Sequence, residues 1–245
     1  MVPAELIILT GALAGGFVTG LTGFGTGLTA LVFWLQVVQP IVAAPLVVLC
    51  SIIGQLSTLS AIWRHIVWAR VFPFIAGGIV GVPLGTLLLP QIELDTFKLL
   101  VGCLLIIYSG IMLLKRSTPT VRWGNRYMDA CVGLGGGILG GLAGLSGPLV
   151  TIWGSLQGWG KDEKRGLFQA FNISILFFAA ASQAYSGFFT ADVGKWMLFA
   201  TPGTLLGAWA GRKTYDRLGD HHFNQIVLGL LMLAGISIIL SLKMT

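Results

Sequence analysis

The sequence predicts an all-α integral membrane protein of two inverted-topology repeats, each a glycine-broken helical hairpin followed by three transmembrane helices. Only 10% of the 245 residues are charged, 55% are hydrophobic and the mean hydropathy is +0.87, whereas soluble domains carry about 25% charged residues. A glycine-rich segment occurs twice, and basic residues gather in short loops of the kind that orient membrane spans. Long apolar runs without alternation favour helices over barrel strands.

The duplication is clearest in residues 13–35 and 134–156. These segments align when Gly20 is set on Gly141, an offset of 121 residues. Each copy is interrupted at its centre, by Gly-Phe-Gly-Thr-Gly from residue 23 and by Gly-Leu-Ser-Gly-Pro from residue 144. Because glycine and proline make a helix hard to continue, each copy is expected to form a hairpin. Duplicated membrane segments broken at matching positions indicate the binding site of a transporter.

Loop charge sets the predicted orientation. Basic residues mark 64–70, 115–126 and 212–217 as cytoplasmic, and 161–165 more weakly. The segment between two of these loops, 127–160, must then enter and leave the membrane on the same side. By the same parity the first hairpin opens outward, so the repeats begin on opposite sides of the membrane and both chain termini lie outside.

Charge-free windows give the elements in order. Repeat one is expected at residues 1–117, with a hairpin at 5–38 and spans at 41–63, 71–90 and 97–114. A cytoplasmic linker at 118–126 leads to repeat two at 127–245, with a hairpin at 128–158 and spans at 166–187, 194–211 and 222–242. A bilayer crossing takes about 20 helical residues. The hairpin arms are shorter than that, so re-entrant arms and thin crossings both stay open.

The middle span of each repeat carries glycines four residues apart. At an offset of 126 residues, Gly77, Gly81 and Gly85 match Gly203, Gly207 and Gly211. This spacing places the glycines on one helix face and predicts close packing between helices. The same faces leave a homodimer open.

Ionisable residues are absent from the charge-free windows, apart from Asp129 at the edge of the second hairpin. The three cysteines lie in apolar windows and form no C-x-x-C pair. The sequence therefore predicts no cofactor and no metal site, while coupling to H+ or Na+ stays open because carbonyl groups alone can bind sodium. The basic loops orient the chain and do not indicate nucleic acid.

Neutral polar side chains surround the two breaks. A second half-helix presents free N–H groups and the positive end of its dipole, here near Thr26 and Ser146, and these attract a small anion. Gln169 and Asn172 lie three residues apart on one helical face and would add donors. The alternative for any single hydroxyl is a bond to its own helix backbone. The candidate binding residues are Thr22, Gly23, Gly25, Thr26, Gln55, Gly144, Ser146, Gly147, Gln169 and Asn172.

Two other functions fit parts of the sequence. Residues 144–147 have the G-x-S-G form found around the nucleophile of intramembrane serine proteases of the rhomboid type, but the nearest downstream histidines, His221 and His222, are expected in a loop and repeat one has no such serine. The sequence therefore predicts that the protein is not an enzyme. An anion channel on the same scaffold stays an alternative to a transporter that works by alternating access.

The glycine-rich segments, Gly15 to Gly27 and Gly136 to Pro148, resemble the repeated signature of the sulfite exporter TauE/SafE family. The resemblance spans nearly the whole chain, including its two halves and basic loops. It implies a multi-pass transporter of the bacterial inner membrane, surrounded by lipid, that moves a small anion such as sulfite, a sulfonate or a related carboxylate, often by export.

Overall fold

The computed structural model describes residues 3–59, 66–114, 125–157 and 161–215, together with parts of 228–242, and every regular element in these residues is helical. Five of the described helices are long and apolar enough to cross a membrane. The predicted helical membrane fold is therefore confirmed. Residues 60–65, 115–124, 158–160 and 216–227 lie outside the described part. They include parts of the predicted cytoplasmic loops and the start of the predicted span 222–242.

The first hairpin consists of α1 (Ala4–Thr22) and α2 (Thr26–Trp34). Between them Gly23 and Gly25 adopt φ values of 83° and 114°, which side chains with a Cβ rarely tolerate. The amide of Gly23 donates to the carbonyl of Thr19 over 2.8 Å and ends α1. Near the open end of the hairpin, the indole N–H of Trp34 donates to the carbonyl of Ile8 over 3.0 Å and holds the two arms together.

The second hairpin consists of α6 (Arg126–Ala143) and α7 (Gly147–Leu156). Its turn contains Gly144 at φ 67°, and Ser146 occupies the N-cap position, one residue before the helix begins. Near the open end, the indole N–H of Trp153 donates to Asp129 Oδ1 over 2.8 Å. Ile8 and Asp129 are equivalent at the offset of 121 residues, so each hairpin is fastened to a matching position of its first arm.

The remaining helices are longer. They are α3 (Pro40–Leu59), α4 (Trp68–Leu88) with a short 3-10 turn η2 (Leu89–Gln91), α5 (Leu94–Leu114), α8 (Lys161–Tyr185) and α9 (Ala191–Tyr215). α8 begins five residues before the predicted start at 166 because it includes the charged residues 161–165, which a charge-free window leaves out. The division into two repeats at 117 and 127 stays a prediction.

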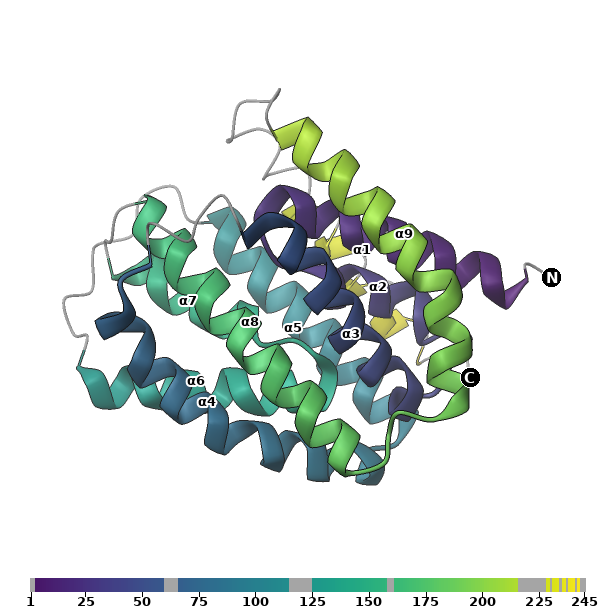
Figure 1. Ribbon diagram of the computed structural model, residues 1–245, viewed down its shortest axis with the longest axis horizontal. Coiled ribbons are helices and arrows are strands. Elements are labelled where there is room, and N and C mark those ends of the chain that lie inside the picture. Colours follow the sequence, from purple (N-terminus) through teal and green to yellow (C-terminus); the bar gives the residue numbers. More distant parts are fainter. Residues whose placement is uncertain are drawn as a thin grey trace.

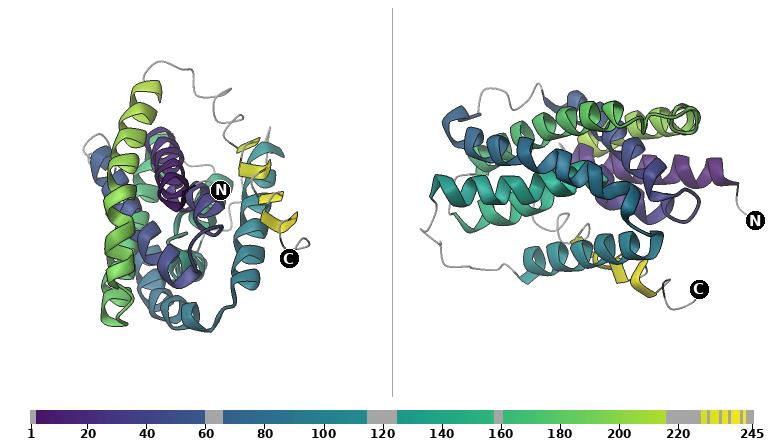
Figure 2. Two further views of the ribbon diagram at one scale, coloured as in Figure 1. Left: turned by 90° about the vertical axis from the view of Figure 1, so that its right-hand side faces the viewer. Right: turned by 90° about the horizontal axis from the view of Figure 1, so that it is seen from below.

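The helices cross in pairs that join the two halves of the chain. α1 lies beside α9, and α4 lies beside α6 (Figure 1). α5 lies beside the C-terminal segment, drawn yellow in Figure 2. There a Cβ on Gly102 would come within 2.7 Å of Ile239 Cγ1. The short helices α2 and α7 lie inside this frame of longer helices.

Glycines make the two main crossings close. Any Cβ on Gly77, Gly81 or Gly85 of α4 would overlap the backbone carbonyls of α6, which belong to Ala130, Leu134 and Ile138. The glycines of α9 face equivalent residues of α1: Gly203, Gly207 and Gly211 face Leu9, Leu13 and Phe17. The glycine spacing thus allows the close helix approach that the sequence predicts. Since residue numbers rise together along both pairs, the helices of each pair run in the same direction.

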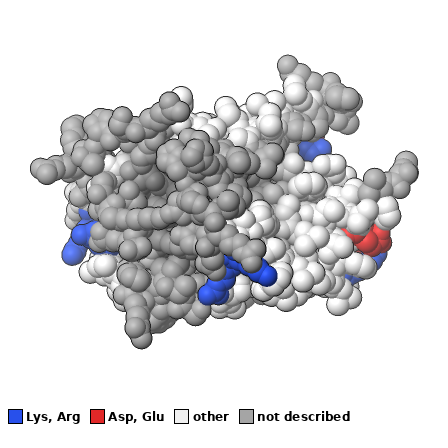
Figure 3. All heavy atoms as spheres, turned by 90° about the horizontal axis from the view of Figure 1, so that it is seen from above, with Lys and Arg blue, Asp and Glu red and all other residues white. Residues whose placement is uncertain are grey.

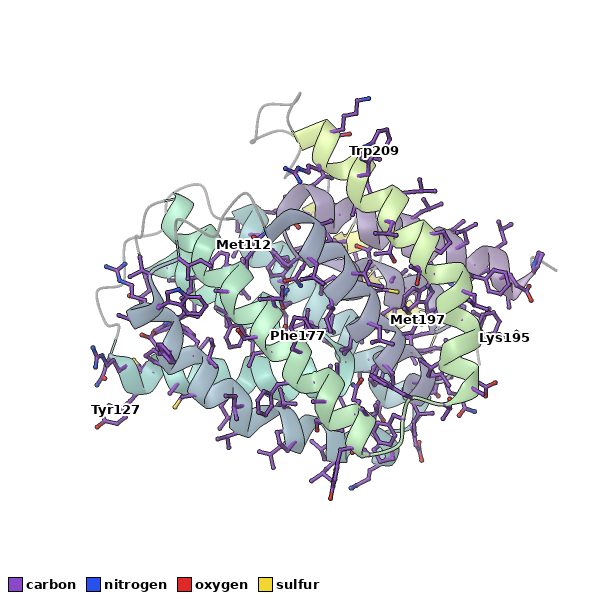
Figure 4. All side chains as sticks on the ribbon, in the orientation of Figure 1. Met112, Tyr127, Phe177, Lys195, Met197 and Trp209 are labelled. Atoms are coloured by element: carbon purple, nitrogen blue, oxygen red, sulfur yellow. The ribbon has the colours of Figure 1, made fainter. Side chains whose placement is uncertain are left out.

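Apolar side chains cover the outside of the long helices. Large exposed hydrophobic residues occur on α4, α5, α8 and α9, and Phe177 and Trp209 project outward in Figure 4, with 51% and 64% of their surface exposed. Few charged side chains are visible on the face in Figure 3, and most of its described surface is uncharged. Such a surface fits contact with lipid rather than water.

A methyl group at these crossings is expected to weaken the fold. We expect Gly81→Ala to destabilise the protein by about 1–3 kcal/mol, because the new Cβ would overlap the Leu134 carbonyl and push α4 away from α6. Gly110→Ala in α5 is the matched control, since nothing lies within 4 Å of its Cβ position. The measurement is thermal unfolding in detergent. Equal melting temperatures for the two variants would contradict the close crossing.

Candidate functional site

The turns of the two hairpins meet in the interior, between α3 and α8. A Cβ on Gly27 would lie 2.8 Å from Leu145 Cδ2, and one on Gly147 would lie 2.9 Å from Phe24 Cδ2. Each turn therefore contacts the first residues of the other hairpin's second helix. This arrangement brings the starts of α2 and α7 to one place.

A cavity of about 10 Å³ lies between the turns, which is the room that a single water needs. Both hairpins line it, with one serine from α3 and one asparagine from α8. Its lining residues are Phe24, Gly25, Gly27, Leu28, Ser51, Gly144, Leu145, Gly147, Pro148 and Asn172. Because four elements from both halves of the chain contribute, movement of either hairpin changes the size of this cavity.

Asn172 of α8 forms the polar wall of the cavity, and Ser146 of the second turn supports it from behind. The Ser146 hydroxyl donates to Asn172 Oδ1, and both side chains are at least 96% buried. This bond fixes the orientation of the amide and uses its oxygen. The two N–H donors of Asn172 are then not taken by Ser146 and can bind an acceptor in the cavity.

Gln169 lies one helical turn before Asn172 and is 3% exposed. Neither its Nε2 nor its Oε1 has a hydrogen-bond partner. Its Nε2 points at the first hairpin turn, where a Cβ on Gly23 would be only 2.5 Å away. A buried amide without partners costs about 1–3 kcal/mol, so Gln169 would be stabilised by a polar partner and is a candidate contact for a bound polar group.

The hydroxyls of Thr19, Thr22 and Thr26 bond within the first hairpin, whereas Thr29 Oγ1 has no partner. Thr26 Oγ1 lies 2.6 Å from Thr19 Oγ1, and Thr22 Oγ1 donates to the Val18 carbonyl over 2.9 Å. Thr22 also donates to the carbonyl of Phe24. These contacts match the structural alternative for the threonines, in which a hydroxyl satisfies neighbouring groups of its own hairpin.

The predicted site residues thus fall into three groups. Gly25, Gly144, Gly147 and Asn172 line the cavity. Ser146, Gly23 and Gln169 lie outside the lining: Ser146 bonds to Asn172, and Gln169 Nε2 faces Gly23. Thr22 and Thr26 bond inside the first hairpin, and Gln55 is buried on α3 outside the lining.

Ser51 lines the cavity but is not among the site residues predicted from the sequence, although the duplication could have identified it. Ser51 is equivalent to Asn172 at the offset of 121 residues, so a contact on one side of the duplication implied one on the other. The sequence-based prediction also omits Phe24 and Leu145, which are equivalent to each other in the same way. No polar pattern could have identified these two residues, because they contribute apolar side chains.

The two walls differ in polarity. At the offset of 121, Gln169 of α8 corresponds to Val48 of α3, and each lies against the turn of the opposite hairpin. Gln169 faces Gly23, whereas Val48 Cγ2 would be 3.2 Å from a Cβ on Gly144. The α8 wall therefore supplies amides, and the α3 wall supplies mainly hydrocarbon.

The starts of α2 and α7 bring backbone N–H donors to the cavity. α2 begins at Thr26 and α7 at Gly147, and the first amides of a helix have no partner within it. Both dipoles direct their positive ends to the same place. Among the described residues no charged side chain is buried, and they include no group of His, Cys, Asp and Glu that could hold a metal.

Comparison with known proteins adds one finding. Neither the curated proteins nor the solved structures include a match to this chain. The family model for the sulfite exporter TauE/SafE matches residues 7–238. That match covers α1 from residue 7 onward, the whole of α2, α6 and α7, and the cavity between the turns. The chain therefore belongs to the sulfite exporter TauE/SafE family of membrane transporters.

Proposed function

We propose that this protein is a secondary transporter of a small anion, with sulfite and sulfonates as the first candidates, and that the anion binds between the two hairpin turns. The observation that carries the proposal is the buried Gln169 amide, which has no partner and points at the first turn. Membership of the family supports the class of substrate and export as the direction.

The chemistry of the cavity favours an anion over a cation. Helix starts and amide N–H groups are donors, and two half-helices contribute them here. The site has no buried cation among the described residues, so the anion is held by neutral groups alone. A neutral site binds an anion without trapping it, which a transporter needs for release.

The helix pairs support inverted halves and alternating access. α4 and α6 run in one direction, and so do α1 and α9. If successive elements alternate, α1 and α6 run in opposite directions because five elements separate their starts. In Figure 1, α1 extends inward from the N-terminus on the right, whereas α6 begins at the left. Two halves of opposite sense offer one central site to the two faces in turn.

The size of the cavity also favours alternating access. A volume of about 10 Å³ is too small for a sulfite ion, so the hairpins must move apart before the anion can bind between them. Transport then requires the hairpins to separate on one face at a time. A channel on the same scaffold would instead open to both faces together, and single-channel currents would reveal it.

A serine protease is a poorer fit to the geometry. The Ser146 hydroxyl donates to the side-chain oxygen of Asn172. An amide oxygen is not a general base that could activate a nucleophile. The same bond suits a binding site, because it fixes the direction of the amide donors.

Removing the polar wall should weaken anion binding. We expect Ser146→Ala and Asn172→Ala each to weaken binding of sulfite about tenfold, because each loses a hydrogen bond to the anion or to its binding partner. The measurement is thermal stabilisation of the purified protein by sulfite, thiosulfate, sulfonates and short carboxylates.

Proteoliposome flux with and without pH and Na+ gradients then tests transport. Ser109→Ala is the control, since that serine bonds to its own helix in α5. If none of these anions stabilised or crossed the membrane, the proposal would be wrong.

Gln169 should separate stability from function. We expect Gln169→Leu to raise the free energy of unfolding in anion-free buffer by about 1–3 kcal/mol, because it removes an unpaired buried amide, and to abolish flux. Gln183→Leu is the matched control. Its Nε2 donates to the Gly141 carbonyl over 2.9 Å, so that variant should lose stability. A Gln169→Leu protein that is less stable yet transports normally would assign the amide a purely structural role.

A further inference from the structure

Two apolar side chains cross between the hairpins at the cavity. Phe24 belongs to the first turn and Leu145 to the second, and the two are equivalent at the offset of 121 residues. The Phe24 ring lies against Gly147, and Leu145 lies against Gly27. Both side chains also line the cavity. Each turn therefore places one apolar side chain across the start of the opposite half-helix.

Glycine on the far side of both contacts allows the two side chains to approach closely. A Cβ on Gly147 would lie 2.9 Å from the Phe24 ring, and a Cβ on Gly27 would lie 2.8 Å from Leu145. Both distances are shorter than side chains accept, so the turns reach this position only over bare backbone. The glycine side of each contact has no side chain that interlocks with Phe24 or Leu145.

The two contacts are supported differently. Phe24 packs edge to face on Tyr108 of α5, with ring centroids 6.1 Å apart and planes at 81°. Tyr108 is itself 5% exposed, so it is a fixed support. Leu145 is aliphatic and 2% exposed, so it forms no comparable ring pair. Edge-to-face aromatic pairs contribute about 0.5–1.5 kcal/mol beyond their buried area, which holds Phe24 more firmly in the closed position.

We propose that Phe24 and Leu145 are the two gates of the cavity, each closing it toward one face of the membrane. This inference rests on the proposed transport function and adds the residues that control access. Phe24 and Leu145 occupy equivalent positions in two halves of opposite orientation. Opening one gate and opening the other therefore expose the cavity to opposite faces. The gates are apolar, so in the closed state they exclude water and ions from the amide wall behind them.

The test measures access to the cavity without using any anion. Ser51 lines the cavity and is 4% exposed, so Ser51→Cys is a reporter for a membrane-impermeant maleimide. The background replaces Cys50, Cys103 and Cys131 with alanine. Labelling rates are compared in right-side-out and inside-out vesicles. Melting temperatures identify any variant that fails to fold.

Four variants test the two gates, two variants for each gate. Phe24→Ala removes one gate, and Gly147→Ala holds the same gate open with a methyl group. Leu145→Ala and Gly27→Ala do the same for the other gate. We expect the first pair to raise labelling about tenfold or more from one face only, and the second pair from the opposite face only, because each weakens one closed contact. Phe72→Ala removes an outward-facing ring, with 63% of its surface exposed, and should leave both rates unchanged.

The other outcomes would overturn the proposal. Folded variants that leave labelling unchanged, or that raise it from both faces alike, or two pairs that open the same face, are each incompatible with one gate per face. The flux assay is separate from this measurement. The expected labelling without anion flux would support the gates and contradict the proposed anion transport. Anion flux with unchanged labelling would support anion transport and contradict the gates.

Discussion

The whole arrangement depends on close contact between helix backbones at two crossings. Glycines of α4 and α9 allow the carbonyls of α6 and α1 to approach where a methyl group would clash. These crossings connect the halves of the chain, because α1 packs on α9 and α6 packs on α4. A hairpin of one half is thus held by a span of the other half. The turns of both hairpins are brought together as a consequence, and the cavity exists only where they meet.

The duplication gives the cavity two equivalent walls, on α3 and α8, and the two walls differ in polarity. Gln169 and Asn172 make the α8 wall polar, while the equivalent positions on α3 carry Val48 and Ser51. Burying an unpaired amide is costly in a protein interior, and it is costlier still within a membrane, where no bulk water can replace the missing partner. The chain carries that cost at Gln169 and avoids it at Val48. An anion would therefore lie nearer α8, where it can satisfy the amide.

The sequence was sufficient to locate the breaks because these depend on local backbone chemistry. Positive φ angles at Gly23 and Gly144 follow from glycine itself, and the four-residue spacing in α4 and α9 follows from helix geometry. The pairing of helices could not be derived in this way. A glycine face predicts that another helix packs closely, but it does not identify that helix. The direction of the Thr26 hydroxyl was equally inaccessible, because its contact with Thr19 depends on how the hairpin closes.

The threonines of the first hairpin show how one half kept its packing while it diverged from the other. In the second half, Ile175 fills the space beside Gly78 and Gly140. At the equivalent positions of the first half, Gly54 faces the methyl groups of Thr204 and Thr19. In the second half the large side chain is on α8, and in the first half the larger side chains are on the helices that face α3. Close-packed interiors tolerate such exchanges when the total side-chain volume is kept. The presence of threonines here then follows from the need for small branched side chains.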